Sequence, residues 1–413
     1  MWLLILMGEL YEYTKDWKKQ VHFAIIRLGC RKLLTGCQAK EKRGLFEMKK
    51  VLVAGHICLD ITPVFSREAG EVSLDPGKLF VVGPAAISTG GAVANAGLAM
   101  HFFGVDVTLL GKVGNDRFGE LVRSAVQSFG VKEKIKSDDG CATSYTVVIA
   151  PPDVDRTFLH CPGANDAFSE QDITEEDLSG IDLLHFGYPP LMRRMFQQEG
   201  EELLHILKKA KEKGVITSLD MAAVDPAAEA GKADWKTILK KVLPYVDLFV
   251  PSFEELCFML RKERYEELVQ KGGDLCLLTK IAELRSMAEE ALAMGASCVM
   301  LKAGAAGICY ACKKDSRFVA QLNLRPDQWE AKEGFVPSFA PETVRSATGA
   351  GDTAIAAFLA AMLRGDGLEH CVTLASAAGA ACVEAYSALG GLISLEELEK
   401  RINNGWQSQI LIA

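Results

Sequence analysis

One short segment, residues 346–352, combines the residue types that phosphoryl transfer needs. It reads Ser-Ala-Thr-Gly-Ala-Gly-Asp and is followed directly by the small-residue run Thr-Ala-Ile-Ala-Ala-Phe. Gly349, Ala350 and Gly351 let the backbone approach a ligand, and the run behind them predicts a helix whose free amides would attract an anion. An aspartate beside an anion cradle is unfavourable unless it takes a proton, so we predict that Asp352 is a general base. The alternative is an ordinary helix start, capped by its own threonine or aspartate.

Two other places could hold the molecule that receives the phosphate. Gly90 and Gly91 precede a predicted helix of small residues, permit close approach of a polyhydroxy ligand, and lead to Asn95, which offers both a donor and an acceptor. Asp60, at the end of the first predicted strand, could bind two adjacent sugar hydroxyls. The alternatives are a plain tight turn for the glycines and a loop or capping role for the aspartate.

Two further segments could contact a nucleotide and its metal ion. Residues 247–255 end a predicted strand with carboxylates that suit Mg²⁺, although Ser252 and Glu255 also have the spacing of a helix capping box. Residues 302–307 read Lys-Ala-Gly-Ala-Ala-Gly after another strand, which is similar to a nucleotide-contacting turn. The chain has no G-x-x-x-x-G-K-[ST] sequence, so it is not a P-loop enzyme.

Composition narrows the class of protein. The chain has 413 residues, 49% of them hydrophobic, but no apolar stretch approaches the ~18 to 20 residues that span a bilayer. A formal net charge of −8 argues against a nucleic-acid partner. Most of the twelve cysteines lie in apolar runs, as reduced core cysteines do, so we expect a cytoplasmic protein. Cys309 and Cys312 form a lone C-x-x-C, for which metal or redox use is disfavoured because no second pair is present.

The first 47 residues differ from the rest. They carry nine basic and five acidic residues, a net charge of +4, which leaves −12 for residues 48–413 because the whole chain carries −8. They have neither the basic start nor the cleavage site of a secretory signal. We predict a domain over 48–413, with 1–47 as an extension that is disordered or not native.

From Met48 onward, short β-branched runs alternate with helical stretches, which predicts an α/β fold with a mostly parallel sheet and helices on both faces. Active sites of such sheets lie at the carboxyl ends of the strands. Residues 62–88 and 141–168 lack helical periodicity and are rich in Pro, Gly and Asp. We expect them to form a small β appendage, which could be a lid or the face of a homodimer.

The order and spacing of these segments, with Gly-Lys-Val-Gly-Asn-Asp-Arg-Phe-Gly at residues 111–119 between them, resemble the ribokinase-like (PfkB) carbohydrate kinases from about Met48 to the C-terminus. That family also includes nucleoside kinases. The resemblance implies a ribokinase-like fold and transfer of the γ-phosphate of ATP to a hydroxymethyl group of a sugar or nucleoside. It also implies that ATP and Mg²⁺ are required.

Mapped onto this chain, the resemblance assigns roles to the candidate residues. Asp352 would be the base, and the turn before it would supply the anion hole through Gly349, Ala350, Gly351 and the amide of Asp352. The acceptor would contact Asp60, Gly90, Gly91 and Asn95. ATP would lie along Lys302, Gly304, Gly307 and Thr348, the helix over 375–384 would border adenine, and Glu255 would organise Mg²⁺ through water.

Three departures from the family pattern qualify these expectations. Ser252 stands where the family usually has Asn, which alters the Mg²⁺ network. Ser346 stands where an Asp often helps to bind a monovalent cation, so potassium activation is not supported. The stretch after Asp220 lacks the Asn and Arg often found there, so the acceptor need not be ribose.

Two other functions stay open at this point. A nucleoside kinase would need an aromatic side chain to stack a base, for which Phe158 and Tyr188 are candidates, although both are more typical of a core. A catalytically silent sugar sensor is disfavoured, because a protein without catalysis has no use for a base at Asp352.

Overall fold

The computed structural model describes residues 48–65, 77, 79–151 and 157–413, and Lys49–Ala413 forms one compact unit. The predicted extension over 1–47 lies outside the described residues, as do parts of both predicted appendage segments. No helix of the described chain is long and apolar enough to cross a membrane.

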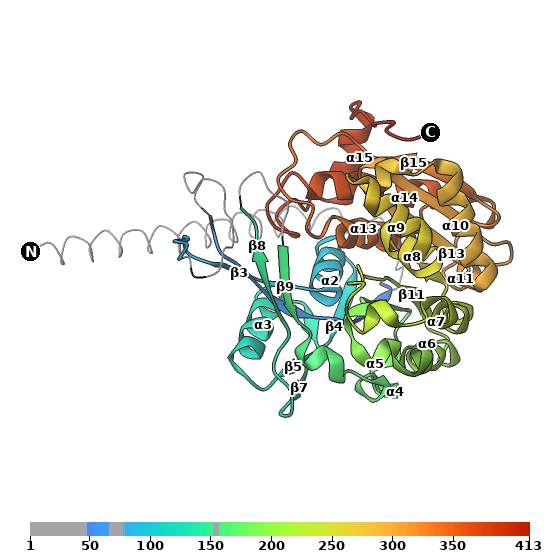
Figure 1. The fold of residues 1–413 in the computed structure, drawn as a ribbon. Coiled ribbons are helices and arrows are strands. Elements are labelled where there is room, and N and C mark those ends of the chain that lie inside the picture. The colour runs from blue at the N-terminus through green and yellow to red at the C-terminus, as the bar shows by residue number, and fades with distance from the viewer. Residues whose placement is uncertain (1–47, 66–76, 78, 152–156) are drawn as a thin grey trace, which may run out of the picture. The chain divides into compact units, whose positions relative to one another are not determined.

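A nine-stranded sheet forms the centre of the unit (Figure 1). The seven strands from β6 to β13 are parallel, and β14 and β15 each pair antiparallel with the preceding strand. In spatial order the strands are β6 (Lys132–Glu133), β4 (Asp106–Leu110), β1 (Lys50–Gly55), β10 (Leu183–Gly187), β11 (Ile216–Leu219), β12 (Leu248–Phe249), β13 (Cys298–Ala303), β14 (Gly307–Cys312) and β15 (Glu333–Pro337). The central strands are mostly apolar because both of their faces are buried, although β10 carries His185 and β11 carries Thr217 and Ser218.

Helices cover both faces of this sheet, as alternating strands and helices require. One hydrophobic cluster contains side chains of α2 (Ala92–Phe102), α3 (Arg117–Gln127), α11 (Arg317–Gln321), α12 (Pro326–Trp329), α13 (Ala350–Arg364), α14 (Leu368–Cys382) and α15 (Leu395–Asn403). The second contains side chains of α4 (Glu175–Leu178), α5 (Arg193–Phe196), α6 (Glu201–Glu212), α7 (Trp235–Val242), α8 (Phe253–Leu260), α9 (Lys262–Lys271) and α10 (Ile281–Met294). The predicted mostly parallel α/β fold is confirmed.

Small side chains explain how α2 and α13 reach the same edge of the sheet. Helix α2 is buried over residues 92–100, and it packs against β1, β4 and α13 (Figure 1). A methyl group added at Gly97 would overlap Cδ2 of Leu109 on β4, so glycine there lets the helix lie this close without displacing that side chain. Close packing brings the N-terminal turns of both helices to the carboxyl ends of β1 and β10.

The predicted β appendage corresponds to a second, four-stranded sheet. Its order is β3 (Ala86–Gly90), β2 (Cys58–Thr62), β8 (Tyr145–Ile149) and β9 (Thr157–Cys161). A separate pair joins β5 (Lys112–Gly114) to β7 (Lys136–Asp138). Asp60 lies inside β2 of the small sheet, so its predicted place at the end of the first strand is wrong: β1 ends at Gly55, and a short turn separates the two strands.

The lone C-x-x-C is divided between two layers of the core. Cys309 lies opposite Leu301 and packs in one hydrophobic cluster, whereas Cys312 lies opposite Cys298 and packs in the other. Residues three apart on a strand point to opposite faces, so the two thiols of this motif cannot share one ligand.

Candidate active site

The segment before Asp352 forms the start of helix α13. The helix begins at Ala350, and Gly349 before it has a left-handed backbone with φ 75° and ψ 2°. A side chain at Gly349 would be strained there and would overlap Ala388. The N-cap residue is Gly349, which has no side chain, and no side-chain cap hydrogen bond is found there among the described residues, so the alternative of a start capped by Thr348 or Asp352 is not supported.

Fewer backbone amides are available at this turn than the sequence indicates. The amide of Ala350 donates to the carbonyl of Ala347 at 3.3 Å, which leaves the next amides, of Gly351 and Asp352, in the first turn of a 15-residue helix. A Cβ at Gly351 would meet only Lys302, with Cε at 3.6 Å, which is an ordinary contact. Neither backbone strain nor packing therefore requires glycine at 351, and close approach of a ligand is the remaining reason for it.

Asp352 is buried and held by two side chains from other elements. Its side chain is 3% exposed. The amide of Asn95, on α2, donates to Oδ2 at 3.0 Å, and the hydroxyl of Tyr188 lies 2.9 Å from Oδ1 and 2.8 Å from Oδ2. Burial raises the pKa of Asp352, while these hydrogen bonds and the charge of Lys302 act in the opposite direction. A carboxylate with a raised pKa and a fixed orientation is suited to accept a proton.

Asp60 lies in a polar row that crosses the small sheet. It pairs in register with Ser88 on β3 and with Thr146 on β8, and Thr146 pairs with His160 on β9. Residues directly opposite one another share a face of the sheet, so these four side chains face one way. Burial raises the pKa of Asp60, and the negative charge of Asp352 adds to the shift, which places the row near Asp352.

Both glycines of the predicted pair lie where a larger residue would overlap neighbouring side chains. A Cβ at Gly90 would overlap the carboxylate of Asp60, and Gly91 has a φ of 84° with a Cβ position 2.5 Å from Nδ1 of His56. The pair therefore brings Asp60 and His56 against the start of α2, which carries Asn95. The alternative of a plain tight turn does not describe it.

Sequence reasoning missed two histidines beside this turn. Nε2 of His56 lies 3.4 Å from Nε2 of His160, and Nδ1 of His160 lies 3.0 Å from the hydroxyl of Thr146. Burial lowers the pKa of His56 to about 3 and also lowers that of His160, so both imidazoles are neutral near neutral pH. Nδ1 of His56 is buried and has no hydrogen-bond partner among the described residues. Only the position of His56 just after β1, at a strand carboxyl end, could have indicated it.

Lys302 connects the anion cradle to a second buried carboxylate. Its ammonium forms an ion pair with Asp220 at 2.7 Å and also donates to the carbonyl of Val250. Burial raises the pKa of Asp220 to about 8, against the charge of Lys302, and Glu255 and Asp352 raise it further. The ammonium of Lys302 and the carboxylates of Asp220, Glu255 and Asp352 thus interact electrostatically.

Glu255 does form the capping box that the sequence offered as an alternative. The amide of Ser252 donates to Oε2 of Glu255 at 2.6 Å, and the amide of Glu255 lies 3.3 Å from Oγ of Ser252. Glu255 also interacts electrostatically with Asp352 and Asp220. Carboxylate and hydroxyl oxygens are the donors that Mg²⁺ prefers, so the residues present fit this ion.

The other predicted nucleotide contacts lie around the end of β13. Gly304 follows this strand, with Sγ of Cys276 3.6 Å from its Cβ position, and a Cβ at Gly307 would overlap the carbonyl of Val336. Packing of β14 on β15 therefore already accounts for glycine at 307. Thr348 lies in the turn before α13, where its carbonyl accepts from Sγ of Cys382, 3.6 Å away.

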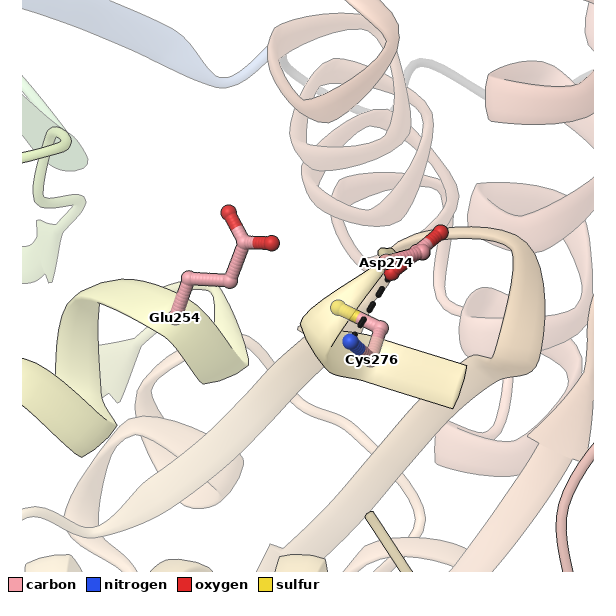
Figure 2. Close-up of side chains that lie close together, drawn as sticks. All are labelled: Glu254, Asp274 and Cys276. Carbon is pink, nitrogen blue, oxygen red and sulfur yellow. Dashed lines mark hydrogen bonds between the residues drawn. The ribbon is translucent and has the colours of Figure 1, made fainter. Parts of the chain in front are cut away.

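Glu254, Asp274 and Cys276 lie close together (Figure 2), and Sγ of Cys276 lies near Gly304. One ligand atom of each residue lies within 4.8 Å of the others, and Oδ1 of Asp274 accepts from the amide of Cys276 at 2.8 Å. Burial raises the pKa of the Cys276 thiol, which keeps it protonated and a poor metal ligand. The two carboxylates are exposed, and we assign no ion to them.

Comparison with known proteins gives this site its context. The profile of the pfkB family carbohydrate kinases matches residues 48–392. A sugar kinase of Archaeoglobus fulgidus without an assigned substrate is 26% identical over 300 residues, which cover 71% of this chain and 98% of that protein. The ribokinase of Bacillus subtilis is 23% identical, with 86% of this chain and all of that protein covered.

Solved structures share the fold. The Arabidopsis thaliana ribokinase complexed with ribose and ATP has a TM-score of 0.62 at 20% identity, covering 86% of this chain and 98% of that one. A nucleoside kinase of Methanocaldococcus jannaschii has a TM-score of 0.61 at 19% identity, covering 86% of this chain and 99% of that one. The fold and site define a phosphotransferase with an alcohol group as acceptor. The chain belongs to the pfkB family of carbohydrate kinases, as its motifs predicted.

Proposed function

We propose that this protein transfers the γ-phosphate of ATP to a hydroxymethyl group of an uncharged sugar, with Asp352 as the general base. The observation that carries the proposal is the buried, doubly hydrogen-bonded carboxylate of Asp352 in the first turn of α13. The amides at this helix start would attract phosphate, and the carboxylate in the same turn can take a proton. Both groups therefore lie at one point.

In this mechanism Asp352 removes the proton from the attacking hydroxyl as the oxygen–phosphorus bond forms. The amides of Gly351 and Asp352, with Ala350 beside them, stabilise the negative charge of the transferred group. Lys302 supplies a positive charge from below the same turn, where Asp220 and the Val250 carbonyl hold it. The proton ends on the carboxylate, whose raised pKa favours this transfer.

Gly304, Gly307 and Thr348 would border ATP, as the family resemblance implies, and Glu255 would hold Mg²⁺ through water. When bound, Mg²⁺ supplies charge neutralisation to the phosphates. Because Ser252 already bonds one oxygen of Glu255, contact through water suits this carboxylate better than direct ligation.

The acceptor side favours a neutral polyhydroxy compound. Asp60 and Asp352 both lie there, and their charges would repel a sugar phosphate. Neutral His56 and His160 offer nitrogen atoms that can donate to or accept from hydroxyls. A relative, the ATP-dependent ribose-1-phosphate kinase of Halopiger xanaduensis, is 27% identical over 56% of this chain and 71% of its own length, so the charge of the acceptor is worth testing directly.

A nucleoside is the second candidate acceptor, and one observation favours it. Phe158 lies two residues from His160 on β9, hence on the same face of the small sheet, and its side chain is 52% exposed. A screen of ATP consumption with sugars, sugar phosphates and nucleosides separates the candidates. Turnover with neutral sugars supports the proposal, whereas turnover confined to sugar phosphates or nucleosides would contradict it.

We further propose that the kinase domain extends over residues 48–413 and that the small sheet acts as its lid. The polar row containing Asp60 and His160 would cover the acceptor. The opposite face exposes Ile87 and Leu159, by 57% and 55%, and we propose that it pairs with a second copy in a homodimer. Sedimentation of wild type and Ile87→Lys would test this pairing. All ten described cysteines are free thiols, which fits a cytoplasmic enzyme.

A further inference from the structure

The side chain of Tyr188, a residue outside the family motifs, contacts the carboxylate of Asp352. It comes directly after β10, and its hydroxyl lies within 2.9 Å of both carboxylate oxygens of Asp352, 164 residues further along the chain. Its ring is 5.9 Å from that of His56. Tyr188 therefore connects the base to the histidine beside the acceptor site.

The backbone at Tyr188 is held in an uncommon conformation. Its φ of 66° and ψ of 44° are left-handed, which costs a non-glycine residue free energy. Two prolines follow immediately, at positions 189 and 190, and the preceding Gly187 accepts from the amide of His56 at 3.2 Å. This rigid turn aims the ring at α13, and the strain persists because the flanking segments fix it.

The hydroxyl of Tyr188 acts as a donor to Asp352. Burial and the charge of Asp352 raise the pKa of Tyr188 well above its usual value, so the phenol keeps its proton. Together with the Asn95 amide it fixes the plane of the carboxylate. A carboxylate has about four acceptor sites, so lone pairs remain for a substrate hydroxyl.

We propose that Tyr188 is the positioning residue of the general base, orienting the carboxylate of Asp352 toward the acceptor hydroxyl. The proposal rests on the function proposed above and adds to it a residue that no motif indicates. It also replaces the expectation that Tyr188 belongs to the core or stacks a base, because its polar end is committed to Asp352.

The pKa of Asp352 is a property that a merely structural tyrosine would not change. The groups that act on Asp352 are Lys302, Glu255, Asp60 and Asp220, and Tyr188→Phe changes none of them. The Tyr188 hydrogen bond lowers the pKa of Asp352. Removing it should therefore raise this pKa further, because a hydrogen bond that stabilises the charged carboxylate is lost.

The experiment compares wild type, Tyr188→Phe and the control Tyr310→Phe, which removes a hydroxyl from a buried tyrosine of β14. We expect Tyr188→Phe to lower kcat about 10- to 100-fold with little change in KM for ATP, and to move the acid limb of the kcat profile to higher pH. Tyr310→Phe should leave both unchanged. Melting temperatures identify any loss of folding.

Carboxyl titration by carbon-13 NMR reads the same effect without activity. A raised Asp352 pKa in Tyr188→Phe supports the proposal even if no tested acceptor is phosphorylated, an outcome that would contradict only the proposed function. An unchanged Asp352 titration in a folded Tyr188→Phe protein, or an unchanged kcat and pH profile, would overturn the role of Tyr188.

Discussion

The two halves of the candidate site consist of different chemical groups. On the acceptor side, Asp352, Asp60, Tyr188 and His160 converge through side chains carried by four separate elements. On the nucleotide side, the groups that face the inferred ATP are mainly backbone amides and glycines, at residues 349–352 and 304–307. Lys302, Glu255 and Asp220 contribute charge there.

This difference has a physical reason. Phosphate is the same in every reaction of such an enzyme, and backbone amides bind it without encoding identity. An acceptor must be distinguished by hydroxyl positions, which needs side chains at fixed places. Substitutions on the nucleotide side should therefore affect turnover with any acceptor, whereas those on the acceptor side should be selective.

The largest effect is expected where the two halves meet. Asp352→Asn should keep the fold and ATP affinity but lower kcat by about 10² to 10⁴, the usual contribution of a positioned general base. Steady-state kinetics and calorimetric ATP binding measure the two effects. More than a tenth of wild-type turnover in the purified variant would show that the base is elsewhere.

The pH dependence of the wild-type enzyme belongs to the same prediction. Asp352 must be ionised to take a proton, and burial raises its pKa. Turnover should consequently rise with pH through this raised pKa, at a higher pH than for an ordinary aspartate. A flat kcat profile between pH 4 and about 8 would disagree with a buried carboxylate base.

Gly351→Val tests the nucleotide side and should lower kcat by about 10²- to 10³-fold, as loss of one oxyanion-type contact does. Because the residue is helical and only Lys302 is near, the side chain should obstruct phosphate rather than unfold the turn. The matched control is Gly349→Ala, which should instead lower the melting temperature, since φ is 75° there. Normal turnover and phosphate affinity in Gly351→Val would refute the anion cradle.

Asp60→Ala tests the acceptor side. The acceptor KM should rise about 10-fold or more, because a carboxylate bond to a hydroxyl contributes about 1.5 to 3 kcal/mol, while KM for ATP should hardly change. Asp60→Asn keeps the size and isolates the charge. Equal increases in both Michaelis constants would remove the distinction between the two halves.

The smallest effect is expected from the N-terminal extension. A chain that begins at Met48 should fold and match the full chain in activity, because none of the inferred site residues precedes it. Comparing melting temperature and kcat of the two chains checks this. A lower melting temperature of the shorter chain would show that residues 1–47 belong to the folded domain.

Much of the fold was predictable because its elements depend on local sequence patterns. Three local patterns each indicate an element and its place at the sheet edge. They are the apolar run at β1, the small residues of α2 and the glycine turn before α13. The small four-stranded sheet was predictable only as irregular β structure, since pairing of β2 with β8 joins segments more than 80 residues apart. The strand boundary before Asp60 was missed because a single glycine, Gly55 with φ 121°, is the only turn residue at the junction of β1 and β2.

By itself, the sequence determined the family, the order of the elements and the candidate base, because these depend on residue types at short spacings. Tertiary structure decided which side chains reach that base. Tyr188 and Asn95 meet Asp352 across 164 and 257 residues, and His56 meets His160 across 104. Such contacts depend on how parallel strands bring their carboxyl ends to one edge, and on an uncommon backbone conformation at Tyr188, neither of which any local spacing records.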